Sequence, residues 1–305
     1  MTKISVVMCV HNGEKFIYES VNSILQQTYK NFELLILDDA STDKTPKILK
    51  SLQKKNSKIR IYKNIKKLGL TKSLIKLISK SNGLYIARLD ADDICKKNRL
   101  EIQTRWLSKS EKNLLIGSSG FKINEKSKII GKFNLENLNH NRLKKKLLFK
   151  NYFLHSSIMF KKNYYKKVGG YNSKYVFSQD YDLWCKLSNI GRIKNISKNL
   201  VYLRQHKKSI SVKNKKKQSL NAFIISCLNQ DKNIYLKTTK YSQIINHLSK
   251  ITNIKKHFNV MCYLYSEYLP KKFTKNLFDL NFEEIKYLLQ DKDFVLRKTA
   301  KKFFI

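Results

Sequence analysis

Three groups of acidic residues in this chain have positions that suit binding or catalysis, and the tightest is Asp90, Asp92 and Asp93. Carboxyl groups so close together repel one another and do not all stay ionised without a cation. Hard oxygen ligands of this kind select Mg²⁺ or Mn²⁺. The alternative is an acidic turn that caps a helix beginning near Lys97. The position of the group directly after a buried apolar run favours a metal site.

A second acidic pair, Asp38 and Asp39, also follows a short apolar run. One interpretation is an N-cap for the next helix. The other is a carboxylate that accepts hydrogen bonds from a nucleobase or a ribose, as acidic residues after early strands do in nucleotide-binding sheets. The sequence contains neither a GxGxxG nor a GxxxxGK[ST] motif, which argues against a dehydrogenase and against an ATPase.

The third acidic place is Asp180 and Asp182, within the run 179–184. On one helical turn an apolar side can anchor the helix while a carboxylate points elsewhere. The alternative is an ordinary helix start with Ser178 as its N-cap. Farther on, Arg204 and His206 end a predicted strand, and a lone histidine in such a place is more often structural than a ligand.

Strands and helices alternate through the first hundred residues and must position the first two acidic groups. Helical spacing of apolar residues predicts helices between the strands, the third of them over 70–81 and ending at Asn82 and Gly83. The order implies a doubly wound parallel sheet, which binds ligands at the carboxyl ends of its strands. His11 and Asn12, like the Asp38–Asp39 pair and the Asp90–Asp93 group, follow the carboxyl end of a predicted strand. Short apolar runs predict four buried strands: 4–10, 32–37, 59–62 and 85–89.

The alternation loosens after Arg99. A lysine-rich stretch, 207–217, marks a predicted boundary, and the sequence from 218 onward is predicted to be helical. The elements predicted before that boundary are strands over 114–118, 157–160 and 200–204, a basic helix over 142–150 and a helix over 178–188.

Composition restricts the class of protein. The 305 residues include 63 Lys and Arg against 22 Asp and Glu, a net charge of +41, yet 42% are hydrophobic, which excludes a disordered chain. Such a surface attracts phosphate, although part of the excess reflects heavy use of Lys, Asn and Ile. No apolar run approaches the roughly 18 residues of a membrane span, so we expect a cytoplasmic protein with its five cysteines reduced.

Taken together, these motifs resemble the family-2 inverting glycosyltransferases of GT-A fold. The resemblance covers residues 1 to 210, and residues 211 to 305 carry no motif of this kind. It implies an α/β fold of GT-A (Rossmann-like) type, with a mostly parallel central sheet flanked by helices and a helical, basic C-terminal region. The segments that carry the resemblance are Ile4–Met8 with His11-Asn12-Gly13, Leu37–Asp43, Gly69-Leu70, Gly83–Asp93 and Gln179–Trp184.

The resemblance also implies domains and roles. Residues 1–95 would bind the nucleotide and 96–210 the acceptor, with 211–305 as an extension. Asp180 would be the general base, Gln179 standing where many relatives have Glu. Asp92, Asp90 and His206 would hold Mn²⁺ or Mg²⁺. The nucleotide-sugar donor, most often a uridine compound, would contact Val10, His11, Asp39, Lys72 and Asp90.

The implied function is metal-dependent transfer of a sugar, with inversion, to a hydroxyl of a glycan or lipid-linked glycan in surface polysaccharide or lipooligosaccharide synthesis. The closest alternative is a nucleotidyltransferase acting on sugar phosphates. A basic nucleic-acid-binding protein is a weaker one, because no zinc, homeodomain or RNP-type motif is present, and we expect no nucleic acid partner. The basic amphipathic segment 142–153 and the end 301–305 favour peripheral binding to an anionic membrane on the inner face of the cytoplasmic membrane, the alternative being a solvated charged surface.

Overall fold

The computed structural model describes residues 3–148 and 150–206, and six further positions between 218 and 229. The chain divides into two compact units. One comprises Met1–Lys144 and Tyr152–Lys207, and the other Lys145–Asn151 and Lys208–Ile305. Most of the second unit lies outside the described residues, as do the predicted boundary at 207–217, most of the predicted helical extension and the basic end of the chain. The following description therefore concerns the first unit and helix α5.

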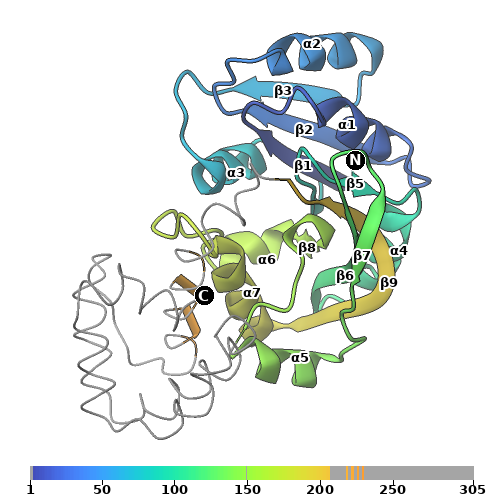
Figure 1. Ribbon diagram of the computed structural model, residues 1–305. Helices are drawn as coiled ribbons and strands as arrows, with labels where there is room; N and C mark the ends of the chain where they lie inside the picture. The colour runs from blue at the N-terminus through green and yellow to red at the C-terminus, as the bar shows by residue number, and fades with distance from the viewer. Residues whose placement is uncertain are drawn as a thin grey trace, which may run out of the picture. The chain divides into compact units, whose positions relative to one another are not determined.

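The first four strands are parallel, as the sequence predicts, and their order is β3-β2-β1-β4. Figure 1 shows β3, β2 and β1 side by side. Almost every side chain of β1, β2 and β4 is buried, which explains their continuous apolar runs. Val10 pairs with Asp38, so the first two strands end level with each other. The bounds are β1 (Ile4–Val10), β2 (Phe32–Asp38), β3 (Ile59–Lys63) and β4 (Tyr85–Arg88).

The three connecting helices are α1 (Ile17–Leu25), α2 (Thr45–Lys55) and α3 (Leu70–Ser79). The predicted end of the third helix at Asn82 and Gly83 is wrong, because α3 stops at Ser79. Gly83 serves another purpose: a Cβ there would lie 2.4 Å from the backbone nitrogen of Ser5. The glycine therefore permits close approach of the chain to β1 rather than termination of a helix.

A cluster around Glu33 closes the amino end of the parallel strands. Its carboxylate accepts hydrogen bonds from the Ser5 hydroxyl (2.6 Å) and from the backbone nitrogen of Asn82 (2.6 Å). Arg60 donates to the second oxygen at 3.0 Å. Glu33 thus connects β1, β2, β3 and the segment before β4. This cluster lies at the amino ends of the strands, whereas the acidic residues follow their carboxyl ends.

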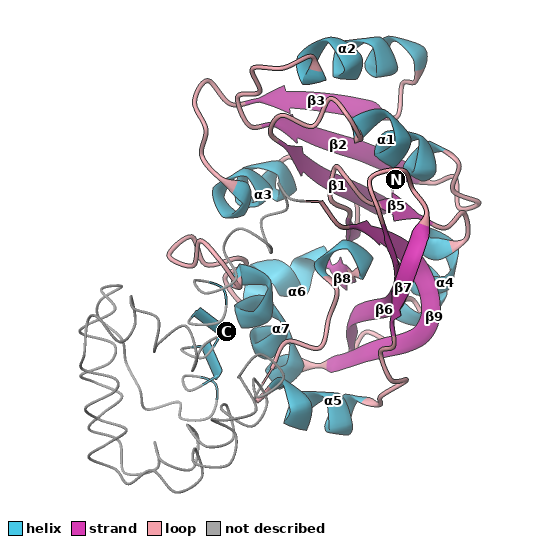
Figure 2. Ribbon diagram, viewed as in Figure 1, coloured by secondary structure: helices cyan, strands magenta, loops and turns pink. Residues whose placement is uncertain are grey.

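The sheet continues into a mixed half, where β8 pairs antiparallel with β4. The order runs β4-β8-β6-β9-β5, with β7 beside β6, and β6 and β9 are parallel. Figure 2 shows β9 following a curved path beside β6. The predicted strands 114–118 and 200–204 are parts of longer ones. The strands are β5 (Ile94–Cys95), β6 (Asn113–Ile123), β7 (Ile129–Phe133), β8 (Met159–Lys161) and β9 (Arg192–Arg204).

The helices of this half are α4, α5, a 3₁₀ turn η1, α6 and α7; α4 corresponds to the helix expected to begin near Lys97, and α6 was not predicted from the sequence. In the basic segment 142–153 the apolar residues Leu143, Leu147 and Phe153 are buried, while Arg142 and Lys145 are exposed. The predicted helix at 178 begins one residue later than expected. The bounds are α4 (Arg99–Leu107), α5 (His140–Leu147), η1 (His155–Ser157), α6 (Lys162–Lys167) and α7 (Gln179–Ile190).

Two sequence expectations concern the whole chain. Within the described residues, none of the helices has the length and apolarity that crossing a membrane requires. Cys9, Cys95 and Cys185 are free thiols, as predicted, while Cys227 and Cys262 lie outside the described residues.

Candidate active site

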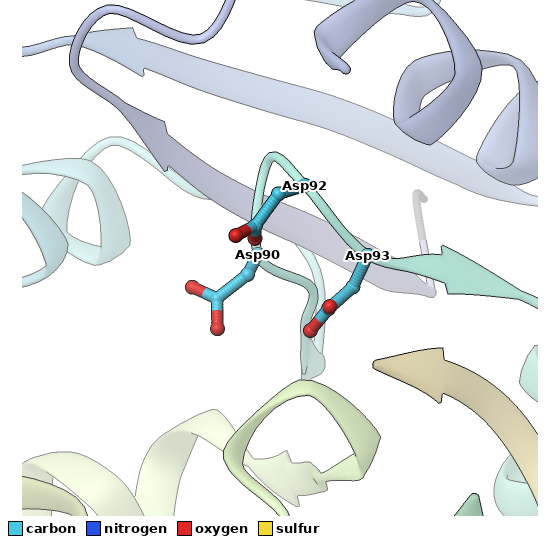
Figure 3. A group of neighbouring side chains, drawn as sticks. All are labelled: Asp90, Asp92 and Asp93. Atoms are coloured by element: carbon cyan, nitrogen blue, oxygen red, sulfur yellow. The ribbon is translucent and has the colours of Figure 1, made fainter. Parts of the chain in front are cut away.

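Three carboxylates converge in the loop between β4 and β5, which we call the acidic loop (Asp90–Asp93). One oxygen from each of Asp90, Asp92 and Asp93 lies within 4.8 Å of the others. Figure 3 shows that Asp90 and Asp92 extend from the turn of the loop, while Asp93 lies at the start of β5. The carboxylates that the sequence predicted as a metal site therefore lie close together.

Arg88, the last residue of β4, faces Asp90 with both of its terminal nitrogens. Its Nη1 donates to Asp90 Oδ2 at 2.5 Å, and its Nη2 donates to Oδ1. The guanidinium is 2% exposed, whereas the Asp90 side chain is 37% exposed. A bidentate pair of this kind fixes the carboxylate in orientation as well as charge. The positive charge of Arg88 thus offsets part of the repulsion among the carboxylates of the acidic loop.

Asp93 is the most enclosed of the three carboxylates. Its Oδ1 accepts a hydrogen bond from the backbone nitrogen of Arg204 at 2.8 Å, and its Oδ2 accepts one from the Ser156 hydroxyl. Burial, together with the charges of Asp92 and Asp90, raises the pKa of Asp93 well above its ordinary value. Asp93 therefore supports the loop from inside, and Asp90 and Asp92 are the carboxylates partly open to solvent.

The far end of β9 meets the acidic loop. His206 Nε2 lies 2.9 Å from Asp92 Oδ2, and the Arg204 side chain donates to the Asp92 carbonyl at 2.8 Å. Arg204 also donates to Glu19 at 2.6 Å and stacks over Phe16, 4.5 Å from the ring centroid. Residues 114 positions apart in sequence are thus placed side by side, as the metal prediction for His206 requires.

The donor atoms fit a divalent cation. Two partly exposed carboxylates with an imidazole beside them provide hard oxygen ligands and one nitrogen, a set that suits Mn²⁺ or Mg²⁺. Asp90, Asp92 and Asp93 are the group whose oxygens lie close enough together to hold such an ion, with Asp93 also bonded to Ser156 and Arg204, and His206 contacts the group through Asp92.

The second acidic group forms an Asp39 cluster (Asp39, Asn64, Leu68 and Gly69). Asp39 Oδ1 accepts hydrogen bonds from Asn64 Nδ2 and from the backbone nitrogen of Leu68, both at 2.8 Å. Oδ2 accepts one from the Gly69 nitrogen, also at 2.8 Å. Burial raises the pKa of Asp39, but these hydrogen bonds outweigh it and hold the pKa below the ordinary value. Asp39 is thus an ionised anchor for the loop that leads into α3.

The other residues predicted to contact a donor surround that cluster. The Asp39 nitrogen donates to the Val10 carbonyl at 2.8 Å, and His11 Nδ1 donates to the Asp39 carbonyl at 2.9 Å. Lys72 lies exposed on the first turn of α3. Asp38 accepts from the Ser41 nitrogen at 2.9 Å, a local turn contact rather than an N-cap of α2.

Asp180 lies in the first turn of α7. The predicted side-chain cap is wrong, because Ser178 has φ 59° and its side chain makes no cap hydrogen bond. The segment before α7 is tied to the start of α3, where the Thr71 hydroxyl donates to the Tyr175 carbonyl at 3.0 Å. The chain leading into the helix that bears Asp180 is therefore joined to the start of α3, the helix that follows the Asp39 cluster.

Tyr171 connects Asp180 electrostatically with the acidic loop. Burial raises the pKa of its phenol well above the ordinary value. The charge of Arg88 lowers that pKa, while the charge of Asp180 adds to the increase, so the phenol lies within electrostatic reach of both. The charges of Arg88 and Asp180 thus both act on the pKa of this buried phenol.

Sequence reasoning missed several residues of the site, among them Arg88, Ser156 and Tyr171. Arg88 carried a signal, because a charged residue within a buried strand and two positions before a carboxylate needs a partner. Ser156 carried none, since its role depends on contacts with residues more than 60 positions away.

Comparison with known proteins gives the class. The family model described as "Glycosyl transferase family 2" matches residues 5–169. A Haemophilus influenzae protein named "Uncharacterized glycosyltransferase" is 31% identical over 256 residues, 81% of this chain and 75% of that protein. Given this match and the site just described, the chain belongs to glycosyltransferase family 2 and is a transferase enzyme.

Two further relatives refine the likeness. The "O-antigen biosynthesis glycosyltransferase WbnJ" of Escherichia coli is 35% identical over 210 residues, 68% of this chain and 81% of that protein. The structure of Staphylococcus aureus TarS 1-349 in complex with UDP-GlcNAc has a TM-score of 0.62 at 15% identity, covering 95% of this chain and 90% of that one. The latter likeness shows the fold, which is GT-A as the sequence predicted.

Proposed function

We propose that this glycosyltransferase moves a sugar from a nucleotide-sugar donor, a UDP-sugar, to a hydroxyl group of a glycan or lipid-linked glycan, with inversion. The observation that carries the proposal is the meeting of Asp39, the Asp90–Asp92 carboxylates and His206 at the carboxyl edge of the sheet. Ligands of open α/β sheets bind at this edge. The TarS structures with UDP and UDP-GlcNAc support a uridine donor.

Asp180 acts as the general base in this mechanism. An acceptor hydroxyl is a poor nucleophile, so a carboxylate must take its proton as the new bond to the anomeric carbon forms. One base on the face opposite the leaving group gives a single displacement and hence inversion. Asp92, His206 and Asp90 would hold the divalent cation, which when bound stabilises negative charge on the departing diphosphate.

The Asp39 cluster would bind the other end of the donor. Asp39 is ionised and presents acceptors, and the His11 ring is held beside it by its hydrogen bond to the Asp39 carbonyl. Lys72 is an exposed cation on the adjoining helix turn, where it can attract phosphate. Together these residues suit the base and the phosphates of one nucleotide.

The acceptor proposal rests on the basic character of the chain and on the O-antigen assignment in the name of WbnJ. We place the protein at the inner face of the cytoplasmic membrane, held by electrostatic attraction to anionic lipid. Leu143 and Leu147 of α5 are buried, whereas Arg142 and Lys145 are exposed and can make that contact. Co-sedimentation with anionic but not neutral vesicles is expected, and equal, negligible binding to both contradicts it.

Product analysis tests the main proposal. The purified protein is incubated with a panel of UDP-sugars, Mn²⁺ and a glycan acceptor, and the released compound is identified. Release of UDP together with a glycosylated acceptor is expected. Release of pyrophosphate from a sugar phosphate and UTP would instead indicate a nucleotidyltransferase, which shares paired aspartates and a divalent ion.

A further inference from the structure

The three residues of η1 reach three different parts of the site region. His155 contacts Tyr171, Ser156 contacts the acidic loop and Ser157 contacts the core strand β6. The turn lies between the acidic loop and α7, and its serine side chains are fully buried. None of the roles assigned above to base, donor or cation explains why polar side chains occupy all three positions.

Ser156 is the centre of the polar contacts that support the acidic loop. Its hydroxyl accepts a hydrogen bond from Arg88 Nη1 at 3.0 Å and lies 3.1 Å from Asp90 Oδ2. The same oxygen contacts Asp93 Oδ2 and lies 3.2 Å from the Asp90 nitrogen. One buried hydroxyl therefore fixes two of the three carboxylates and the guanidinium that pairs with one of them.

Ser157 provides an internal comparison. Its hydroxyl donates to the Leu154 carbonyl at 2.8 Å and accepts from the Ser118 nitrogen at 3.1 Å. Both partners are backbone groups of the core, and the structure gives Ser157 no hydrogen bond to the acidic loop. Ser156 and Ser157 are thus equally buried neighbours of the same type, and only the first touches carboxylates.

His155 connects the same turn to the helix that carries Asp180. Its Nε2 forms a hydrogen bond of 2.8 Å with the Tyr171 hydroxyl. The His155 and Tyr171 rings both pack edge-on against Trp184, at centroid distances of 6.0 and 6.5 Å. Trp184 follows Asp180 by four positions, so the two residues lie on the same side of α7. The aromatic group therefore fixes the helix turn from which Asp180 extends.

The chain conformation before Tyr171 indicates that this placement is specific. Gly169 and Gly170 have φ values of 78° and 65°, in the region that favours glycine. A Cβ at Gly170 would lie 2.6 Å from the Tyr165 ring. Two consecutive left-handed residues thus turn the chain so that Tyr171 enters the buried aromatic group.

We propose that the 155–157 turn links the two chemical parts of the site, with Ser156 and Tyr171 as positioning residues. Ser156 orients the carboxylates of the acidic loop for the cation and donor. Tyr171, held by His155, orients the turn of α7 that bears the base. This inference rests on the proposed function for its second part, whereas the first part concerns cation binding and is measurable without sugar transfer.

The first test compares Ser156→Ala with Ser157→Ala. Residues that orient metal ligands typically change metal affinity by about 10- to 100-fold when removed. We expect Ser156→Ala to weaken Mn²⁺ binding, titrated by electron paramagnetic resonance, and UDP binding in its presence by about that factor. Ser157→Ala should leave both affinities within about twofold even if it lowers Tm as much. Equal affinities in the two variants, or no Mn²⁺ binding by the wild type, would overturn the role of Ser156.

The second test compares Tyr171→Phe with Tyr164→Phe, which removes a hydroxyl from a partly buried tyrosine of α6. We expect Tyr171→Phe to lower kcat by about tenfold with the donor KM and the Mn²⁺ affinity unchanged. Tyr164→Phe should leave kcat within about twofold. A Tyr171→Phe enzyme with wild-type kcat overturns the second part. A wild type that binds Mn²⁺ and UDP but transfers no sugar overturns the proposed function and this second part, while the Ser156 comparison still stands.

Discussion

The Asp39 cluster and the acidic loop both place carboxylates at the carboxyl edge of one sheet, yet they hold them by different means. Asp39 is bound largely by backbone nitrogens, those of Leu68 and Gly69. Asp90 is bound by the side chains of Arg88 and Ser156. Backbone donors are kept by every substitution except proline, whereas side-chain donors are removed by alanine. The first site is therefore broken by changing the acid itself, and the second by changing its neighbours.

The largest expected effect lies in neither cluster but at Asp180, which the proposal assigns to reaction rather than to binding. Asp180→Asn should lower kcat by about 10²- to 10⁴-fold, the usual contribution of a general base. Donor affinity, measured by calorimetry with UDP and Mn²⁺, should change little. Comparable turnover in the variant would remove Asp180 from its role and leave both binding clusters without an assigned base.

Arg204→Ala tests whether the acidic loop depends on its neighbours. The buried guanidinium binds the Asp92 carbonyl and the Glu19 carboxylate, and both would lose a partner. We expect the free energy of unfolding, measured in urea, to fall by about 3 kcal/mol. Lys15→Ala breaks an exposed pair with Glu125 and should cost less than about 1 kcal/mol. Equal costs for the two variants would contradict the comparison.

Asp39→Asn tests the backbone-held cluster. Loss of charge-assisted hydrogen bonds from Leu68, Asn64 and Gly69 should destabilise the protein by about 2 kcal/mol at pH 7. Because the folded pKa of Asp39 is lowered, its stabilisation is present above the unfolded pKa of about 3.9 and is lost as pH falls through the folded pKa. Urea midpoints of both proteins should therefore converge in acid, and a pH-independent difference would refute this.

Lys72→Ala should have the smallest effect. The side chain is exposed, so the free energy of unfolding should change by no more than about 0.5 kcal/mol. A surface charge facing a phosphate contributes up to roughly 1 kcal/mol, and the donor KM should therefore rise less than about fivefold. Lys54→Ala, on a helix without proposed site residues, is the matched control. An identical KM in both variants would exclude Lys72 from donor binding.

The parallel half of the fold is predictable from sequence because its strands are continuous buried runs and its acidic residues follow them directly. The Asp38–Asp39 pair and the acidic loop were found in this way. The mixed half is less predictable, since β6 and β9 extend well beyond their most apolar residues. Gly83 was misread because close approach to Ser5, rather than helix termination, requires it.

The sequence predicted which carboxylates belong to the site, but it did not predict the residues that hold those carboxylates in place. His206 was uncertain from the residues alone, and its contact with Asp92 depends on the course of β9. Arg88 and Ser156 form hydrogen bonds with residues of the acidic loop. Ser156 belongs to η1, more than 60 positions farther along the chain. Local patterns of hydrophobicity carry no record of long-range polar contacts such as those of Ser156, so a single sequence does not reveal them, whereas Arg88 carried a local signal beside Asp90.

Glu33 and its partners occupy the opposite pole of the parallel strands, away from every residue assigned to base, donor or cation. One end of the parallel strands therefore carries the residues proposed for function, and the other end carries hydrogen bonds that stabilise the fold. A harmful substitution around Glu33 would reduce how much folded enzyme a cell contains. Each molecule that did fold would still work as before, so such a defect would be recognised by protein abundance and not by altered kinetics.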